Sequence, residues 1–411
     1  MRILILTDRF TPEISAPSFR LMEHAKVWRE AGQDVTVVTC APNSPRGIVF
    51  PGYRNRAFQR EVLEGVDVIR VWTYMTANEG TLKRTVDYAS YLASVAVQAG
   101  RLPEADVVLA SSPPFFVALA GWVVARRMRA PWVFELRDLW PASIRAVGVS
   151  QSRVLELVEK VELGLYRDAA RVLCLTRSFR DELVGRGIPE SKIDVVTNGV
   201  DADFFHAGAV TFDARRRLGL GPDAFLAGYI GTTGLAHGLT TLLDAAERLR
   251  GRPQIHLLIL GEGAERRKLE AAARERGLAH VHFGDNVPHA EIPSYLAALD
   301  VSIVHLRPDP LFRTVIPSKI FESMAMGVPI LMGVEGESAE IVAECGAGVC
   351  IPSGDAEAMA AALTRMAGDP AGRRALGEQG REAVRARYSR RSLALAALQS
   401  LMEAHRQTPG A

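Results

Sequence analysis

The sequence predicts an α/β fold of two doubly wound domains, each built on a parallel sheet, which face each other across a cleft. Three observations lead to this prediction. Short apolar runs alternate with amphipathic helical segments along the whole chain, the alternation starts again after Asn198, and 411 residues suffice for two or three domains. Continuous apolar strands separated by helices are typical of a parallel sheet that is covered on both faces.

The first series of apolar runs predicts the sheet of an amino-terminal domain, residues 1–197. Its strands are expected at Ile3–Leu6, Val35–Thr39, Val66–Val71, Val107–Ala110, Trp132–Glu135, Val172–Leu175 and Ile193–Val196. Helical patterns separate most of them, for example at Phe19–Ala31, Thr81–Gly100 and Leu155–Tyr166. The stretch Val107–Ala125 holds nineteen residues without a charge, which approaches the length of a membrane span. Because Pro113 and Pro114 interrupt it, we expect a strand, a loop and then a buried helix from about Phe115.

The second series predicts a carboxyl-terminal domain, residues 207–387, which begins after the polar stretch Thr197–His206. Its strands are expected at Phe225–Ile230, Ile255–Leu260, Val281–Phe283, Val301–His305, Pro329–Met332 and Gly348–Ile351. Helices are expected at Thr240–Leu249, Glu265–Arg276, Ser318–Met326, Asp355–Gly368, Pro370–Arg387 and Arg390–His405. Doubly wound sheets bind ligands beyond the carboxyl ends of their strands, so functional residues should follow the strands.

Composition excludes several classes of function. The 49 basic and 47 acidic residues leave a formal charge of +2, which is too balanced for a nucleic-acid coat, so no nucleic-acid partner is expected. The apolar start of the chain is too short for a signal peptide. A zinc site or a disulfide framework is not indicated, because the four cysteines are scattered and form no CxxC pair. They are Cys40, Cys174, Cys345 and Cys350. A reduced, cytoplasmic location is the expectation.

The strongest local signal for chemistry is the segment PLFRTVIPSKIFESMAMGVP, residues 310–329. Its Pro-Ser pair is typical of a helix start with Ser318 as the N-cap, where free backbone N–H groups would bind an anion. Lys319 would add positive charge, and Arg313 could reach the same place. One turn on, the carboxylate of Glu322 could accept two hydrogen bonds from a ribose diol, so the segment suggests a nucleoside diphosphate site. The alternative is that Ser318 only caps a helix, while Lys319 and Glu322 form a solvated ion pair.

Six segments, taken together, carry a family resemblance. They are Phe10–Leu21 (FTPEISAPSFRL), Phe134–Pro141 (FELRDLWP), Val196–Phe204 (VTNGVDADF), Tyr229–Leu239 (YIGTTGLAHGL), Gly261–Gly263 (GEG) and Pro317–Pro329 (PSKIFESMAMGVP). In this order and spacing, and over nearly the whole chain, the sequence resembles retaining glycosyltransferases of family 4 with the two-domain GT-B fold. It is most similar to enzymes of bacterial surface-polysaccharide assembly, including N-acetylfucosamine transferases of O-antigen synthesis. The fold implies that the last helix, Arg390–His405, packs back on the amino-terminal domain, and its broad leucine-rich surface agrees with this.

The resemblance also implies roles for individual residues. On the donor side the matching positions are Gly231 and Gly234 in a glycine-rich phosphate loop, Val287 at the uracil, Ser318 and Lys319 at the diphosphate, and Glu322 at the ribose. In the amino-terminal domain, Asp138 and its neighbours match the segment that faces the acceptor and the transferred sugar. We therefore name Asp138, Arg137 and Lys319 as the catalytic candidates.

The chain departs from the family pattern at several of these places. The departures are Thr314 for the first of two glutamates, Thr232 and His237 for the basic residues of the glycine loop, and Arg137 for a common histidine. We expect Lys319 with Arg313 to supply the missing positive charge. The replacement of the histidine leaves the identity of the catalytic base open.

A basic segment in the first half of the chain suggests an anionic partner. No acidic residue occurs from Val35 to Arg60. In the same span, arginines mix with aromatic side chains: Arg46, Arg54, Arg56 and Arg60 with Phe50, Tyr53 and Phe58. One interpretation is a solvated loop, and the other is a surface for an anionic lipid-linked acceptor at the cytoplasmic face of a membrane.

The sequence thus predicts a transferase that moves a sugar from a nucleoside diphosphate, UDP by expectation, to a glycan or a polyprenyl-diphosphate-linked acceptor. No metal or other cofactor is expected, because Asp201-Ala202-Asp203 lies between the domains, away from any strand end of the donor domain. Two alternatives stay open. A nucleotide-sugar epimerase of the same fold would release no UDP, and a non-catalytic nucleotide-sugar-binding subunit would show no turnover.

Overall fold

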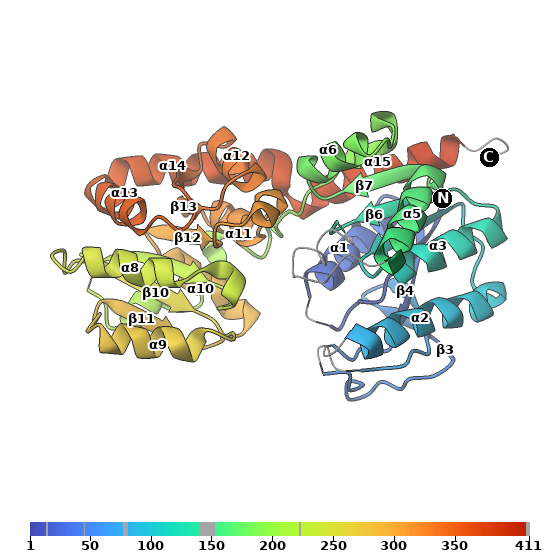
Figure 1. The fold of residues 1–411 in the computed structure, drawn as a ribbon, viewed down its shortest axis with the longest axis horizontal. Helices are drawn as coiled ribbons and strands as arrows, with labels where there is room; N and C mark the ends of the chain where they lie inside the picture. Colours follow the sequence, from blue (N-terminus) through green and yellow to red (C-terminus); the bar gives the residue numbers. More distant parts are fainter. Residues whose placement is uncertain (14, 45, 77–80, 140–152, 222, 408–411) are drawn as a thin grey trace. The chain divides into compact units, whose positions relative to one another are not determined.

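The structure, a computed structural model, describes residues 1–13, 15–44, 46–76, 81–139, 153–221 and 223–407. Contacts within the chain divide it into two compact units. Unit 1 comprises Met1–Thr197 and Arg390–Ala411, and unit 2 comprises Asn198–Ser389. Each unit holds one sheet with helices on both faces, which confirms the predicted fold class of two parallel-sheet α/β domains (Figure 1).

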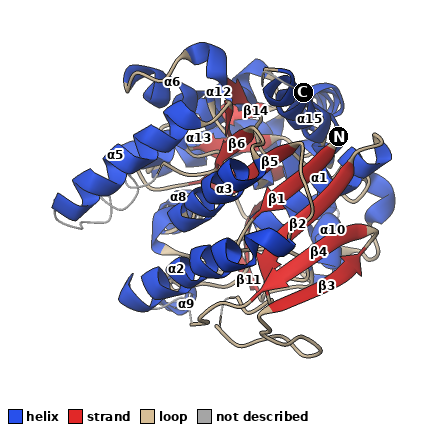
Figure 2. Ribbon diagram, turned by 90° about the vertical axis from the view of Figure 1, so that its right-hand side faces the viewer, coloured by secondary structure: helices blue, strands red, loops and turns tan. Residues whose placement is uncertain are grey.

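The sheet of unit 1 has eight strands in the order β3-β4-β2-β1-β5-β6-β7-β8. In chain order they are β1 (Arg2–Leu6), β2 (Asp34–Cys40), β3 (Phe58–Leu63), β4 (Val66–Val71), β5 (Val107–Ser112), β6 (Trp132–Leu136), β7 (Arg171–Cys174) and β8 (Ile193–Val195). All neighbours run parallel except β3 and β4, which form an antiparallel hairpin at one edge (Figure 2). The sequence analysis missed β3, because an edge strand that is only partly buried needs no continuous apolar run.

Helices cover both faces of this sheet. They are α1 (Ala16–Glu30), α2 (Thr81–Gln98), α3 (Phe115–Met128), α5 (Arg153–Asp168), α6 (Arg177–Gly185) and α15 (Arg390–Arg406). α1 and α15 share one apolar core with one face of the sheet, while α2, α3, α5 and α6 share the core on the other face. The indole N–H of Trp28 in α1 donates to the carbonyl of Ala394 in α15 over 2.6 Å. The last helix is therefore part of unit 1.

The sheet of unit 2 has six parallel strands in the order β11-β10-β9-β12-β13-β14. They are β9 (Phe225–Ile230), β10 (Ile255–Leu260), β11 (Val281–Gly284), β12 (Val301–His305), β13 (Ile330–Gly333) and β14 (Gly348–Cys350). Its helices are α7 (Ala214–Arg217), α8 (Thr240–Arg248), α9 (Arg266–Glu275), α10 (Ile292–Ala298), α11 (Lys319–Ala325), α12 (Glu337–Glu344), α13 (Ala356–Gly368) and α14 (Pro370–Ala383). Two apolar cores lie on opposite faces of this sheet. One contains residues of α8, α9 and α13, and the other contains residues of α10, α11 and α12.

The uncharged stretch Val107–Ala125 forms β5, a proline turn and most of α3, as expected. β5 is fully buried and α3 packs on the sheet, so the apolar residues serve the core of unit 1. Within the residues that the structure describes, no helix combines the length and the apolar character that a membrane span needs.

We predict that the contact of α15 with the sheet contributes strongly to the stability of unit 1. Leu401 is fully buried, so Leu401→Ala should lower the free energy of unfolding by about 2–5 kcal/mol. Leu395 lies on the same helix but is 43% exposed, and Leu395→Ala should change it by less than about 0.5 kcal/mol. All five tryptophans fall in unit 1, so their fluorescence during urea unfolding reports on this unit alone. Equal losses for the two variants would contradict the prediction.

Candidate functional site

Two glycine-rich loops meet at the carboxyl ends of β9 and β10 in unit 2. Gly231 follows β9 with φ of 141°, and Gly261 follows β10 with φ of 131°. A Cβ added to Gly261 would lie 2.2 Å from the carbonyl oxygen of Gly231, which no side chain can tolerate. The loops are also joined by hydrogen bonds from Gly231 N–H to Leu260 O and from Thr233 N–H to Glu262 O, each 2.9 Å. Backbone thus packs directly on backbone, which only glycine permits.

Lys319 lies against this pair of loops. Its ammonium nitrogen is 3.8 Å from the centre of the Tyr229 ring, and it would be 2.7 Å from a Cβ at Gly231. Burial lowers the pKa of the half-buried Lys319 amine to about 7, although the carboxylate of Glu322 acts in the opposite direction. The first residue of α11 is therefore brought next to the glycine loop, and Glu322 is close enough to favour the charged form of the amine.

The structure corrects the expected role of Ser318 as an N-cap. The backbone of Ser318 is already helical, with φ of −59° and ψ of −29°, and its side chain makes no capping hydrogen bond. An N-cap residue normally has an extended backbone, which aims its side-chain oxygen at the next N–H groups. Here the carbonyl of Pro317 accepts from Ile320 N–H over 3.2 Å, so the first turn already begins at Pro317. Ser318 is exposed at the start of the helix.

Arg313 has an acidic partner that the sequence analysis did not anticipate. Its guanidinium forms an ion pair with Glu335, in the loop after β13. Both side chains line a hollow of about 310 Å³ whose lining contains none of Gly231, Lys319 and Glu322. The expectation that Arg313 strengthens the charge beside Lys319 stays a prediction, and in this structure the charge of Arg313 is paired with Glu335.

The remaining donor candidates occupy the same edge of the sheet. Val287, in the loop after β11, is half-buried and packs on the core beneath α10 and α11. Gly234 N–H donates to Nδ1 of His237 over 3.2 Å. Burial, followed by the charge of Lys319, lowers the pKa of His237, so this ring is neutral near pH 7. His237 therefore adds no positive charge to the glycine loop.

Sequence reasoning missed three residues of this site. Tyr229 provides the aromatic face under Lys319, and its hydroxyl donates to Thr232 O over 2.7 Å. The hydroxyl of Thr233 is buried and has no hydrogen-bond partner among the described residues. Gly261 belongs to one of the segments that carry the family resemblance, but the sequence analysis gave it no role of its own. The GEG sequence directly after a predicted strand could have indicated it, because in this structure these glycines allow a close approach of two backbone segments.

In unit 1, Arg137 and Asp138 follow β6. The N–H of Arg137 donates to Ser112 O over 2.9 Å, and Nη2 donates to Pro113 O over 2.7 Å. Burial lowers the pKa of Arg137, while Glu135 and Asp8 raise it. Arg137 thus ties the loop after β6 to the loop after β5, and Asp138 is half-buried beside it. The segment continues into residues 140–152, which lie outside the described residues.

The four arginines of the basic segment are all exposed. Arg54 and Arg56 lie beside exposed aromatic side chains, because Nδ2 of Asn55 between them donates to Thr73 O over 2.7 Å and so holds this loop next to Trp72 and Tyr74. Trp72 and Tyr74 are 44% and 41% exposed. We call this set the basic–aromatic surface: Arg46, Arg54, Arg56, Arg60, Trp72 and Tyr74.

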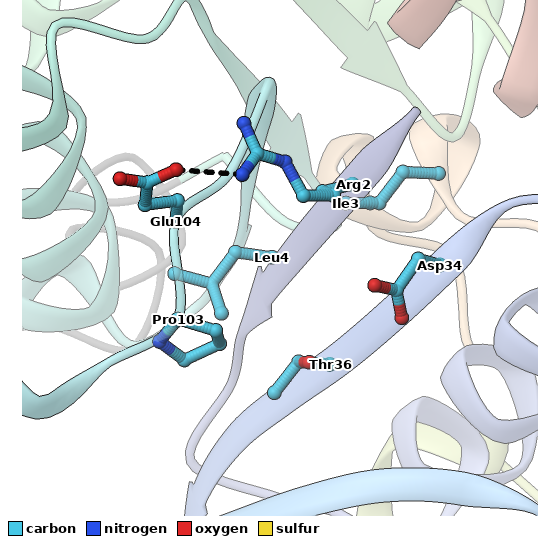
Figure 3. Close-up of a pocket in the computed structure, with 7 residues that line it drawn as sticks. All are labelled: Arg2, Ile3, Leu4, Asp34, Thr36, Pro103 and Glu104. Atoms are coloured by element: carbon cyan, nitrogen blue, oxygen red, sulfur yellow. Dashed lines mark hydrogen bonds and ion pairs between the residues drawn. The ribbon is translucent and has the colours of Figure 1, made fainter.

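Two other features do not form a functional site. Asp201 Oδ1 accepts from the N–H groups of Asp203 and Phe204 over 3.0 and 3.1 Å, so Asp201 stabilises a turn. Among the residues described, no group of three or more His, Cys, Asp or Glu side chains is arranged to hold a metal ion. A hollow of about 190 Å³ lies at the amino-terminal ends of β1 and β2, lined in part by Arg2 and Glu104 (Figure 3). Ligands of doubly wound sheets bind at the opposite edge.

Comparison with protein families identifies two matches, one in each unit. The family described as "Glycosyl transferases group 1" matches residues 211–383, and the family described as "Glycosyl transferase 4-like domain" matches residues 16–199. The chain is also similar to a putative colanic acid biosynthesis glycosyl transferase, WcaI, of Escherichia coli K12. The two are 25% identical over 376 residues, which cover 88% of this chain and 91% of the relative.

Solved structures share the fold. Sucrose-phosphate synthase from Thermosynechococcus elongatus superposes with a TM-score of 0.74 at 21% identity, over 97% of both chains. The Anabaena protein HepE, in complex with UDP-glucose, superposes with a TM-score of 0.71 at 19% identity, over 98% of this chain and 99% of HepE. The arrangement of elements within both units is thus that of GT-B glycosyltransferases.

We predict that the contact between the two glycine loops is required for nucleotide binding. Gly261→Ala forces a Cβ against the carbonyl of Gly231, so the loops must separate, and unit 2 should lose about 1–3 kcal/mol of stability. UDP affinity in titration calorimetry should fall at least tenfold. Gly251→Ala is the matched control, since an added Cβ there has no neighbour within 4 Å and should leave affinity unchanged. Unchanged UDP affinity in Gly261→Ala would show that the contact is not needed.

Proposed function

Because the chain belongs to the glycosyl transferase group 1 family, we propose that it transfers a sugar from a UDP-linked donor to a glycan or polyprenyl-diphosphate-linked acceptor in bacterial surface-polysaccharide biosynthesis. Retention of configuration is part of the proposal, as is the finer resemblance to N-acetylfucosamine transferases. The observation that carries it is the position of Lys319 against the glycine loops of unit 2. The name of the similar WcaI and the UDP-glucose bound to HepE support the pathway and the nucleotide.

The donor is proposed to bind along the first turn of α11. The diphosphate lies against the backbone of Gly231–Gly234 and the ammonium of Lys319, and Glu322 accepts hydrogen bonds from the ribose hydroxyls. Val287 then meets the uracil through main-chain atoms. This assignment is supported by the close approach of Lys319 to Gly231 and by the position of Glu322 three residues further along the helix.

The chemistry follows from the charge that develops on the leaving group. When the bond from the sugar to the diphosphate breaks, negative charge builds up on the phosphate oxygens. Lys319 and nearby backbone N–H groups stabilise that charge, which is commonly a large electrostatic contribution to catalysis. In the proposed retaining mechanism the acceptor hydroxyl attacks from the face that the diphosphate leaves, and a donor phosphate oxygen takes the proton of the hydroxyl. We propose that no divalent cation takes part.

The acceptor is proposed to reach unit 1 from a membrane. The basic–aromatic surface combines four exposed arginines with exposed Trp72 and Tyr74, a set that suits anionic headgroups and the interface below them. A polyprenyl diphosphate at the cytoplasmic face would meet this surface with its own negative charge. Exposed basic side chains alone give reversible binding, so the protein would bind the membrane peripherally.

The direct test of the proposal is an assay of the purified protein with UDP-sugars and polyprenyl-diphosphate-linked sugars. Transfer predicts UDP release that depends on acceptor, with the anomeric configuration of the product read by NMR. An epimerase would convert one sugar nucleotide into another without UDP release. A binding subunit would bind the donor in calorimetry but release no UDP.

We predict that Glu322 contributes strongly to donor affinity. Glu322→Ala removes charge-assisted hydrogen bonds worth about 1.5–3 kcal/mol, so UDP affinity should fall roughly ten- to a hundredfold. Titration calorimetry in EDTA measures this, and wild-type affinity should be the same in magnesium. Glu275→Ala, at an exposed position of α9, is the control and should bind UDP normally. Equal affinity in all three proteins would rule out the ribose assignment.

We predict that UDP binding near pH 8 takes up a proton at Lys319. The pKa of about 7 means that most of the free protein holds a neutral amine at that pH. A bound diphosphate favours the charged form and raises this pKa, so a proton must be taken up. Affinity should therefore fall as the pH rises above 7. Calorimetry in buffers of different ionisation enthalpy measures the uptake, and Lys319→Arg should abolish it because arginine stays charged. Uptake that persists in Lys319→Arg would place the proton elsewhere.

A further inference from the structure

The loop between β1 and α1 holds a buried charged cluster that donor binding does not use. Asp8 and Glu13 are only 8% and 3% exposed, and Arg9 lies between them. Nε of Arg9 is 3.4 Å from Oδ2 of Asp8, and Nη1 is 3.4 Å from Oε1 of Glu13. The loop follows the carboxyl end of β1, at the edge of the sheet where doubly wound folds bind ligands (Figure 2).

Each carboxylate keeps one oxygen without a partner. Oε1 of Glu13 accepts from the N–H groups of Asn43 and Ser44, each over 2.8 Å. Oε2 of Glu13 and Oδ1 of Asp8 are buried, yet neither has a hydrogen-bond partner in the part of the chain that the structure describes. A buried acceptor left without a donor destabilises the fold, and an ionised one destabilises it more. Such destabilisation is expected where a ligand supplies the missing donor.

The loop is also held in place from outside the cluster. Sγ of Cys40, at the end of β2, donates to Asp8 O over 3.2 Å. The buried Arg70 of β4 donates from Nη1 to Cys40 O and from Nη2 to Thr11 O, each over 2.7 Å. Three neighbouring strands thus fix the backbone that carries Asp8 and Glu13. A fixed backbone is what a binding site needs, because little ordering remains to be done when the ligand arrives.

The charges around the cluster indicate what kind of ligand fits. Asp87 of α2 faces the same arginine, and burial, aided by Asp8 and Glu13, raises its pKa to about 6. Three carboxyl groups therefore share Arg9, while Arg137 approaches Asp8 from the loop after β6. An excess of carboxylates disfavours phosphate and favours groups that donate hydrogen bonds. Sugar hydroxyls are such groups, and Arg137 joins the cluster to the segment of Asp138.

We propose that Asp8 and Glu13, oriented by Arg9, form a subsite that binds hydroxyl groups of the acceptor sugar. The inference rests on the proposed function, since it divides the acceptor between two surfaces of unit 1. The hydroxyls of the sugar go to the carboxylates, and the diphosphate goes to the basic–aromatic surface. Asp8 and Glu13 thereby select the acceptor rather than the donor.

The test uses the full chain and the variants Asp8→Asn and Glu13→Gln, which keep shape and remove charge. Asp34→Asn, on an exposed position at the amino-terminal end of β2, is the control. The probes are methyl glucoside, methyl galactoside and N-acetylglucosamine, detected by saturation-transfer NMR, with inorganic pyrophosphate as competitor. We expect at least one sugar to bind wild type and Asp34→Asn, binding at least tenfold weaker in the two variants, and no competition by pyrophosphate.

A purely structural role makes a different prediction. Burial raises the pKa of Asp8, so the charged form is disfavoured in the fold, and Asp8→Asn should melt at the same or a higher temperature while sugar binding falls. Loss of thermal stability with unchanged sugar binding would overturn the proposal. So would competition by pyrophosphate, or the failure of every probe to bind wild type.

Failure of the subsite and failure of the proposed function can be told apart. UDP titration reports on unit 2, and Asp8→Asn and Glu13→Gln should bind UDP as wild type does. If both variants bind UDP and keep the wild-type KM for acceptor, the subsite is wrong while the transferase stands. If wild type binds UDP and the sugars but never transfers, the proposed function is wrong while the subsite stands.

Discussion

The close approach of Gly261 to the carbonyl of Gly231 is the contact on which the proposed donor site depends. It joins the loops after β9 and β10 backbone to backbone, leaving no room for side chains between them. Lys319 can then lie over Tyr229 and beside Gly231. Lys319 is the first residue of α11, and Glu322 lies about one turn further along the same helix. A single steric constraint thus places both a cation and a carboxylate.

The sequence predicted the fold well where burial determines the pattern. Strands such as β1, β5 and β9 are buried on both faces, so their residues form continuous apolar runs that helices separate. β3 escaped detection because its residues are only partly buried and mix Arg60 and Glu61 with apolar side chains. The hydrophobic pattern of a segment indicates how buried the segment is. An edge hairpin such as β3–β4 is determined by pairing with its partner strand instead. The short helices α10 and α12 were not predicted either. They depend on tertiary packing rather than on a long helical pattern in the sequence.

The candidate site was predictable where its residues are close in sequence. Lys319 and Glu322 share one helix, so their spacing could be read directly. Arg313 was placed beside them on the same reasoning, but its ion pair with Glu335 depends on β13, which no local spacing reveals. Tyr229 was missed because a ring in a buried strand looks like core until a cation is found on its face. Contacts between residues that are far apart in the sequence could not be predicted from local spacing.

The charges in each unit agree with the groups that we propose it binds. In unit 2, Lys319 lies beside the glycine loop, and in the proposed donor site its pKa of about 7 would let the amine become charged when a diphosphate binds. Unit 1 keeps its exposed arginines on the basic–aromatic surface and buries carboxylates beside Arg9. A transferase must hold a leaving diphosphate but attack with a neutral hydroxyl. Carboxylates beside the acceptor sugar would repel a phosphate group that approached them. The same charges would orient the hydroxyls, so acceptor selectivity and positioning would come from one small cluster.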